Sequence, residues 1–191
     1  MQKLNFGKME ILKELEKSNM NPKSFILDVD GVLTDGGFYY SADGKVMKKF
    51  GADDNDALSL LRPYLEIIFV TGDKRGFQIS NKRIEDMHFT LELVSTIRRI
   101  DWIKERFSPD EVIYMGDGIF DHYVMKEVGY SIATSDADDN AKKYANYITK
   151  RCGGHRAVSE ACLHLLEKFF VPYNENILPE DNINFARDWT V

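Results

Sequence analysis

Residues 25–36 read FILDVDGVLTDG. An apolar run ends there in two carboxylates one residue apart, and a glycine-bearing turn follows at once. The run over 24–29 is short, apolar and bounded by a proline and a glycine, which predicts a buried strand. In an extended segment residues i and i+2 point to the same face, so Asp28 and Asp30 project together. Such a pair favours a hard divalent cation such as Mg2+ between its oxygens; turn-forming aspartates at a strand end are the alternative interpretation.

More apolar runs follow, and segments of helical periodicity separate them. The expected strands are 24–29, 66–70, 89–94, 111–115 and 129–133, with 146–149 as a further candidate. The expected helices are 54–62, 75–87, 96–107, 120–128, 137–145 and 155–170. Alternating strands and helices predict an α/β fold with a doubly wound, mostly parallel sheet covered on both faces. Ligands of such sheets bind beyond the carboxyl ends of the strands, where the motifs described below fall.

One segment breaks this alternation. Residues 37–50 are rich in Phe and Tyr around an Ala-Asp-Gly turn, which predicts a β-hairpin insertion. The unpaired edges of a protruding hairpin favour pairing with another chain. Residues 1–20 carry a partial apolar stripe that predicts a short amphipathic helix, whereas 171–191 have no clear periodicity. We therefore expect a single domain over 1–170 and a C-terminal tail.

Length and charge limit the classes of function. The chain has 191 residues, enough for one domain with a sizeable core, and its formal net charge is -6. This charge disfavours non-specific binding to nucleic acid or to an anionic membrane surface. The two cysteines form no CxxC pair, and no apolar stretch reaches the length of a membrane span. We expect a cytoplasmic protein with neither nucleic acid nor a membrane as its partner.

Two further motifs follow expected strands. Thr71-Gly72 comes after the second strand, where a hydroxyl and free backbone amides are suited to hold a phosphate. Asp117 follows the fourth strand and completes a metal site with the two aspartates of the first motif. Asp121 either caps the next helix or orients a metal-bound water. Thr-Gly alone is a common strand end, but together these motifs predict a site for a divalent cation and a phosphate group.

The third element is cationic. Arg98 and Arg99 lie near the start of the helix after the third strand, where one of them can reach a phosphate oxygen. Arg98 is the candidate for this phosphate contact, and Arg99 is the alternative. A further interpretation is that both arginines are solvated at the surface. In the same helix the spacing of Ile97, Ile100 and Ile103 predicts a buried apolar face.

In this order, the motifs resemble those of the haloacid dehalogenase superfamily of phosphatases. The residues that carry the resemblance are Asp28-x-Asp30-Gly31-Val32-x-Thr34-Asp35-Gly36, Thr71-Gly72 and Gly116-Asp117-x-x-x-Asp121. More narrowly, the chain resembles the 3-deoxy-D-manno-octulosonate 8-phosphate phosphatase family. A hairpin follows the first motif, residues 153–160 read GGHRAVSE, and no insertion is large enough for a cap domain. The resemblance covers residues 20–170.

The resemblance implies a mechanism. Asp28 would attack phosphorus and form an aspartyl-phosphate, while Asp30 would protonate the leaving alkoxide and then activate the water that releases phosphate. Mg2+ would be held by Asp28, the main-chain carbonyl of Asp30, and Asp117. Thr71 and the adjacent amides would hold the phosphoryl oxygens. The implied substrate is a small phosphorylated sugar or sugar acid, and the implied assembly is a homotetramer to which the hairpin contributes a contact surface.

Several positions depart from the family pattern. A lysine is usual where the two arginines lie, and a second aspartate is common where this chain has Gly118. Asp73 stands where a basic residue is frequent, so the charge beside Lys74 is altered, and Arg156 lies in a glycine-rich segment of unusual order. Lys74 and Arg156 are the candidate substrate contacts. These departures keep the phosphatase chemistry but leave the identity of the sugar acid open.

Two other functions compete with a sugar phosphatase. The missing lysine, Gly118 and the exposed hairpin favour a non-catalytic oligomerisation or regulatory module associated with sugar-nucleotide synthesis. The third function, a phosphatase of nucleic-acid ends, is disfavoured by the acidic charge and by the lack of a basic and aromatic stripe.

Overall fold

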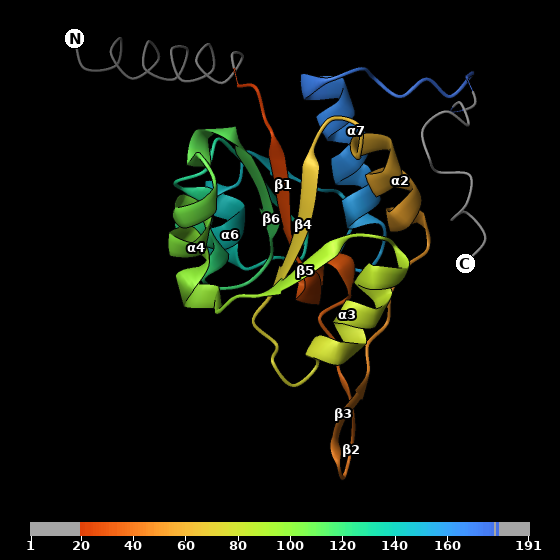
Figure 1. The fold of residues 1–191 in the computed structure, drawn as a ribbon, viewed down its shortest axis with the longest axis vertical. Coiled ribbons are helices and arrows are strands. Elements are labelled where there is room, and N and C mark those ends of the chain that lie inside the picture. The colour runs from red at the N-terminus through yellow and green to blue at the C-terminus, as the bar shows by residue number, and fades with distance from the viewer. Residues whose placement is uncertain (1–19, 178, 180–191) are drawn as a thin grey trace.

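A parallel sheet forms the centre of the molecule (Figure 1). The structure is a computed structural model that describes residues 20–177 and 179. The helix predicted for 1–20 and the end of the predicted tail lie outside the described residues, and the division of the chain at residue 170 stays a prediction. The sheet has six strands in the order β5-β4-β1-β6-β7-β8. They are β1 (Ser24–Asp28), β4 (Glu66–Thr71), β5 (Thr90–Leu93), β6 (Val112–Gly116), β7 (Tyr130–Ala133) and β8 (Tyr147–Ile148).

Helices cover both faces of the sheet (Figure 1). One face carries α2 (Asp53–Leu61), α3 (Phe77–Asp86) and α7 (Ala157–Phe169). The other carries α4 (Arg99–Arg106), α5 (Asp121–Met125) and α6 (Asp139–Tyr144). The predicted α/β fold, a doubly wound parallel sheet with a hairpin, is confirmed. A search of the described helices finds none that combines the length and apolarity of a membrane-crossing segment.

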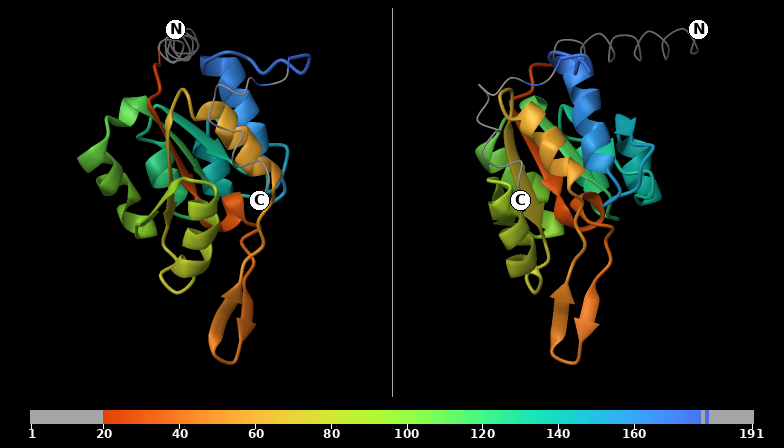
Figure 2. Two further views of the ribbon diagram at one scale, coloured as in Figure 1. Left: turned by 45° about the vertical axis from the view of Figure 1, so that its right-hand side comes forward. Right: turned by 90° about the vertical axis from the view of Figure 1, so that its right-hand side faces the viewer.

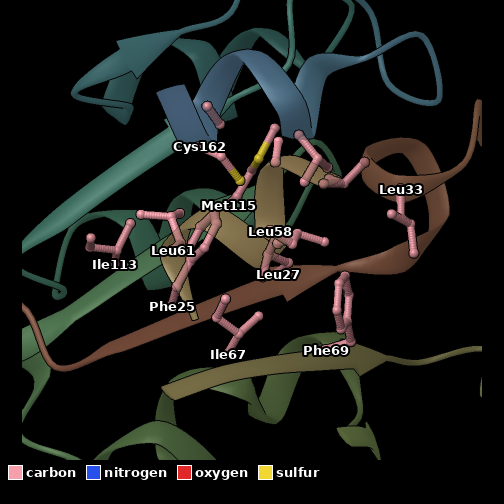
Figure 3. Close-up of a cluster of buried hydrophobic side chains, with 14 of the residues drawn as sticks. Phe25, Leu27, Leu33, Leu58, Leu61, Ile67, Phe69, Ile113, Met115 and Cys162 are labelled. Atoms are coloured by element: carbon pink, nitrogen blue, oxygen red, sulfur yellow. The ribbon is translucent and has the colours of Figure 1, made fainter. Parts of the chain in front are cut away.

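Strand β1 sets the direction of the first aspartate. Its residues are buried throughout, and successive side chains point to opposite faces of the sheet. Phe25 and Leu27 pack against α2 and α7 (Figure 3), whereas Ile26 packs in the second core, on the side of α4 and α5. Burying one such side chain stabilises the fold by ~1.5–3 kcal/mol. Asp28 continues the series on the Ile26 side, so its carboxylate faces α4 and α5.

The hairpin lies between β1 and α2. After a helical turn, η1 (Val29–Leu33), the chain forms the antiparallel strands β2 (Tyr39–Ser41) and β3 (Gly44–Met47). Figures 1 and 2 show this hairpin projecting away from the rest of the molecule. Its large exposed apolar side chains are Phe38, Tyr39, Tyr40, Val46 and Met47.

One predicted apolar face is wrong in part. Ile103 is fully buried, but Ile97 is 64% exposed. The reason is that residues 96–98 form a 3-10 turn, η2, and α4 begins only at Arg99. A helical spacing counted from Ile97 therefore does not hold. The buried face of α4 carries Arg99 and Ile103, which are one turn apart.

Candidate active site

Asp28 lies at the carboxyl end of β1 with both carboxylate oxygens bonded. The guanidinium of Arg99 donates from Nη1 to Oδ2 over 2.7 Å and from Nη2 to Oδ1 over 2.9 Å. The amide of Val29 donates to Oδ1 as well, over 2.7 Å. Burial raises the pKa of Asp28 to about 6, although the charge of Arg99 opposes this rise. The carboxylate is thus oriented by a two-pronged contact, the geometry that arginine forms best.

Arg99 connects three elements of the site. It is the first residue of α4, and only 1% of it is exposed. The same Nη1 that bonds Asp28 also lies 2.8 Å from the Tyr114 hydroxyl on β6 and 2.8 Å from Asp121 Oδ1 on α5. One buried cation therefore faces two buried carboxylates, which keeps both of them from being unpaired charges in the core.

Asp121 fixes the loop that carries Asp117. Its Oδ2 accepts hydrogen bonds from the amides of Asp117 and Gly118, over 2.9 and 2.8 Å. Its Oδ1 accepts from the Tyr114 hydroxyl, over 2.6 Å, and from Arg99. The side chain thus bonds amides that precede α5 and makes no capping bond within that helix. Both oxygens of Asp121 are occupied by protein donors, so its role here is to orient the loop.

Asp117 lies directly over the turn that follows Asp28. A Cβ atom at Gly31 would stand 2.0 Å from Asp117 Oδ2, and Gly31 has a φ of +87°, so this position requires glycine. Asp117 Oδ1 is buried without a hydrogen-bond partner. Burial, together with the charges of Asp28 and Asp121, raises the pKa of Asp117 to about 8. A carboxylate in such surroundings requires either a proton or a cation.

These observations fit a metal ion. Carboxylate oxygens of Asp28, Asp117 and Asp121 lie within 4.8 Å of one another. The unpartnered oxygen of Asp117 and the oxygen-only donor set suit a hard cation such as Mg2+. Asp28 and Asp121 both have their two carboxylate oxygens bonded by protein donors, so the free oxygen of this group is that of Asp117, and Asp28 stays a predicted ligand. The carboxylate of Asp30 is not part of this group, so the main-chain carbonyl of Asp30 stays a predicted ligand.

Asp30 faces the hairpin side of the site. Its Oδ2 accepts a hydrogen bond from Thr71 Oγ1 over 3.3 Å, and its Oδ1 lies 2.7 Å from Lys48 Nζ. Lys48 also pairs with Asp73, at 2.9 Å, and Lys45 pairs with the same carboxylate. Sequence reasoning missed both lysines, because the alternation within a short hairpin does not say which face meets the sheet.

The family of the chain follows from comparison with known proteins. Residues 102–160 match the family of haloacid dehalogenase-like hydrolases. Over 156 residues the chain is 35% identical to the 3-deoxy-D-manno-octulosonate 8-phosphate phosphatase of Salmonella typhi, a match that covers 76% of this chain and 80% of that protein. The chain belongs to this phosphatase family. The predicted family and enzyme class are confirmed.

Solved structures of this phosphatase family share its fold. The cobalt-bound deoxy-D-mannose-octulosonate 8-phosphate phosphatase of Haemophilus influenzae is 28% identical, with a TM-score of 0.70, and the match covers 80% of this chain and 91% of that one. The Moraxella catarrhalis 3-deoxy-D-manno-octulosonate 8-phosphate phosphatase, in complex with a magnesium ion, a phosphate ion and a KDO molecule, is 24% identical. Its TM-score is 0.70, over 80% of this chain and 90% of that chain.

In this family member, the structure places Arg99 in the site and Arg98 outside it. The Arg98 side chain is 74% exposed and pairs with Asp101 over 3.0 Å. The Arg98 side chain does not contact the aspartates of the site, because η2 turns it to the surface before α4 begins, and its role as a phosphate ligand stays a prediction. A signal for Arg99 was present in the sequence: it precedes Ile103 by four residues and so shares the buried face of the helix.

The remaining predicted site residues are exposed at the surface. A Cβ atom at Gly72 would meet Thr96 Cγ2 at 3.2 Å, so the turn after β4 packs against the loop after β5. Lys74 is exposed. Arg156 is exposed as well and pairs with Asp53 over 2.6 Å. Among the described residues, neither Lys74 nor Arg156 pairs with Asp28, Asp30 or Asp117, so their contact with substrate stays a prediction.

Proposed function

We propose that this chain is a Mg2+-dependent phosphomonoesterase that forms an aspartyl-phosphate at Asp28 and acts on a small phosphorylated sugar or sugar acid. Membership in the phosphatase family gives the class of reaction. The observation that carries the proposal for this chain is the meeting of Asp28 and Asp117 at the carboxyl edge of the sheet, with Asp30 beside them.

Asp28 has the properties of the nucleophile. Arg99 and the Val29 amide fix the direction of its oxygens. With a pKa of about 6, the carboxyl group is mostly ionised at neutral pH and can attack phosphorus. The charge of Arg99 also offsets the repulsion between this carboxylate and an incoming phosphate dianion.

Asp30 has the position of the acid and base. Its carboxyl group projects beside that of Asp28 and is held between Lys48 and Thr71. As Asp28 bonds to phosphorus, the bond from phosphorus to the sugar oxygen breaks, and Asp30 gives a proton to that oxygen. The carboxylate that remains accepts a proton from the water that hydrolyses the aspartyl-phosphate.

The metal ligands we propose are Asp28, Asp117 and the main-chain carbonyl of Asp30. When bound there, Mg2+ supplies positive charge that lowers the repulsion between carboxylate and phosphate. The protein positions Asp117 through two hydrogen bonds, which the backbone amides of Asp117 and Gly118 donate to the Asp121 carboxylate. Cobalt in the Haemophilus influenzae relative supports a divalent site in this family.

The substrate class follows from the curated relatives. They are named for 3-deoxy-D-manno-octulosonate 8-phosphate, the first compound to test. The proposed phosphate contacts are the amide of exposed Gly72 and the hydroxyl of Thr71, which would exchange its bond to Asp30 for one to phosphate. In this chain Lys45 and Lys48 both form ion pairs with Asp73. A second anionic group of the substrate would therefore be bound by Lys74 and Arg156.

Assembly and location stay predictions. We propose a homotetramer that uses the exposed aromatic and apolar side chains of the hairpin. A cytoplasmic location and the lack of nucleic-acid or membrane partners are likewise predictions from the sequence.

The test is the release of inorganic phosphate from a panel of sugar phosphates with Mg2+ and with EDTA. The matched control is Asp28→Asn, which keeps the size of the side chain and removes the nucleophile. We expect turnover only for wild type with Mg2+. Wild-type turnover that is no higher than that of Asp28→Asn on every compound would contradict the proposal. Arg99 supplies a cation near the place where the family's usual lysine is missing. The missing lysine therefore no longer favours the competing hypothesis of a non-catalytic module.

A further inference from the structure

Lys48 is a buried cation enclosed by oxygen atoms of three side chains. It follows β3 directly, and its side chain has no exposed surface. Its Nζ lies 2.7 Å from Asp30 Oδ1, 2.9 Å from Asp73 Oδ2 and 2.8 Å from Ser80 Oγ. An ammonium has three N–H donors, and three oxygen atoms surround this one. Because the side chain is buried among these oxygen atoms and does not reach the surface, Lys48 acts through other residues.

Asp30 is held by two elements that lie far apart in the sequence. Lys48, at the base of the hairpin, contacts one carboxylate oxygen, and Thr71, at the end of β4, donates to the other. The backbone of Asp30 has φ −82° and ψ 116°, outside the helical region, although the residue lies within the turn η1. These two contacts define where the carboxyl group points.

Asp73 anchors Lys48 from the opposite side. Its Oδ1 accepts from the Gly76 amide over 3.0 Å, just before α3, and its Oδ2 pairs with Lys45 and Lys48. Burial alone would raise the pKa of Asp73, but the hydrogen bonds from Lys45 and Lys48 outweigh burial and hold that pKa at about 2. The anchor is therefore charged at neutral pH.

We propose that Lys48 is a positioning residue for Asp30. It holds the carboxyl group where it can pass a proton to the leaving oxygen of the substrate, so the hairpin takes part in proton transfer as well as in assembly. This role rests on the proposed function. As the bond from Asp28 to phosphorus forms and the bond from phosphorus to the sugar oxygen breaks, the electron pair stays on that oxygen and the proton of Asp30 neutralises it.

This role predicts a dependence on the leaving group. A sugar oxygen is a poor leaving group and requires the proton, whereas 4-nitrophenyl phosphate releases a stabilised phenolate that does not. The ratio kcat/KM reports the steps up to aspartyl-phosphate formation and excludes the later attack by water. A misplaced Asp30 therefore lowers kcat/KM for alkyl phosphates far more than for aryl phosphates. A general loss of structure lowers both.

The experiment compares Lys48→Met with Lys49→Met on 4-nitrophenyl phosphate and on the best sugar phosphate of the panel. Lys49 is the exposed neighbour of Lys48, so the same chemical change is made one residue away. We expect Lys48→Met to lower kcat/KM for the sugar phosphate by about tenfold or more, and for the aryl phosphate by less than about threefold. Lys48→Arg, which restores a cation, keeps more activity on the sugar phosphate than Lys48→Met. Lys49→Met leaves both values unchanged.

Equal losses on the two substrates, or no loss on either, overturn the proposed role of Lys48. Such a result leaves the proposed function of the protein unaffected. If Lys48→Met does not fold, Ser80→Ala removes one partner of Lys48 and leaves every charge in place. That variant must then show the same selective loss, of about threefold, and an unselective or absent loss overturns the role. A wild-type protein without turnover on any substrate overturns the proposed function, and the role of Lys48 with it.

Discussion

Arg99 donates one hydrogen bond to each carboxylate oxygen of Asp28, over 2.7 and 2.9 Å. The same guanidinium bonds Asp121, and only 1% of Arg99 is exposed. The pair therefore joins the proposed nucleophile to Asp121, the residue that fixes the loop of Asp117. Because all three side chains are buried, removal of the cation leaves two like charges without compensation, which is far more costly than the loss of a surface pair.

Arg99→Met should lower the free energy of unfolding by about 3–5 kcal/mol. Arg98→Met is the matched control, since it makes the same change one residue away in an exposed pair, and it should cost less than about 1 kcal/mol. Urea denaturation of the two variants and of wild type measures both values. Arg99→Lys should recover part of the loss, because it restores the charge but not the two-pronged contact. Equal destabilisation by Arg98→Met and Arg99→Met would contradict this account.

Asp117 should make the metal-free protein less stable as the pH rises. Its pKa is raised from 3.8 to about 8 in the folded state, first by burial and then by Asp28 and Asp121. Between these two values the folded protein binds more protons than the unfolded chain, so the free energy of unfolding falls with increasing pH. The raised pKa of Asp28, about 6, acts in the same direction. Asp117→Asn should flatten the profile of unfolding free energy against pH in EDTA.

The same variant tests the metal site by thermal denaturation at pH 8. Mg2+ should raise the Tm of wild type, because a ligand that binds only the folded state stabilises it. Asp117→Asn should show little or no rise. A wild-type Tm that does not respond to Mg2+, or a variant that responds equally, would remove Asp117 from the set of metal ligands.

The proximity of Asp28 and Asp117 could be predicted from the sequence, because both residues lie at the carboxyl ends of parallel strands. Parallel strands present their carboxyl ends at one edge, so residues that follow β1, β4 and β6 are brought together by topology alone. Within β1 the alternation of side chains also places Asp28 on the same face as Ile26. No tertiary information was needed for these positions.

The cations that contact the aspartates of the site, Arg99 and Lys48, could not be predicted in the same way. Arg99 depends on where α4 begins, and a 3-10 turn of three residues moved Arg98 to the surface. Lys48 depends on the direction in which a short hairpin leaves the sheet, which is set by contacts with Asp73 and Ser80 rather than by any local pattern. Helix boundaries and the placement of insertions are tertiary properties, and both cations depend on them.

Arg156 has a left-handed backbone conformation, with a φ of +71°, at the residue before α7. A side chain in that region costs about 1 kcal/mol relative to glycine. Arg156→Gly should therefore be more stable than Arg156→Ala by about 1 kcal/mol in urea denaturation. Both variants lose the exposed pair with Asp53, so the difference between them isolates the backbone term. An alanine variant as stable as the glycine variant would contradict the inferred backbone strain at residue 156.

The kinetics of these two variants test Arg156 as a substrate contact. If the guanidinium binds a second anionic group of the substrate, glycine and alanine should raise KM for the sugar phosphate by similar factors, whatever their difference in stability. An unchanged KM in both variants would remove Arg156 from the substrate site.

The hairpin should control the oligomeric state. Tyr39, Tyr40 and Met47 are 55%, 60% and 56% exposed on a segment that projects from the molecule, and an isolated two-stranded hairpin gains stability by packing against another surface. Replacing all three with serine should shift the proposed homotetramer to smaller species in analytical ultracentrifugation. Tyr123→Ser is the control, because Tyr123 is equally exposed, at 55%, but lies on α5. A hairpin variant that sediments like wild type would exclude these side chains from the assembly surface.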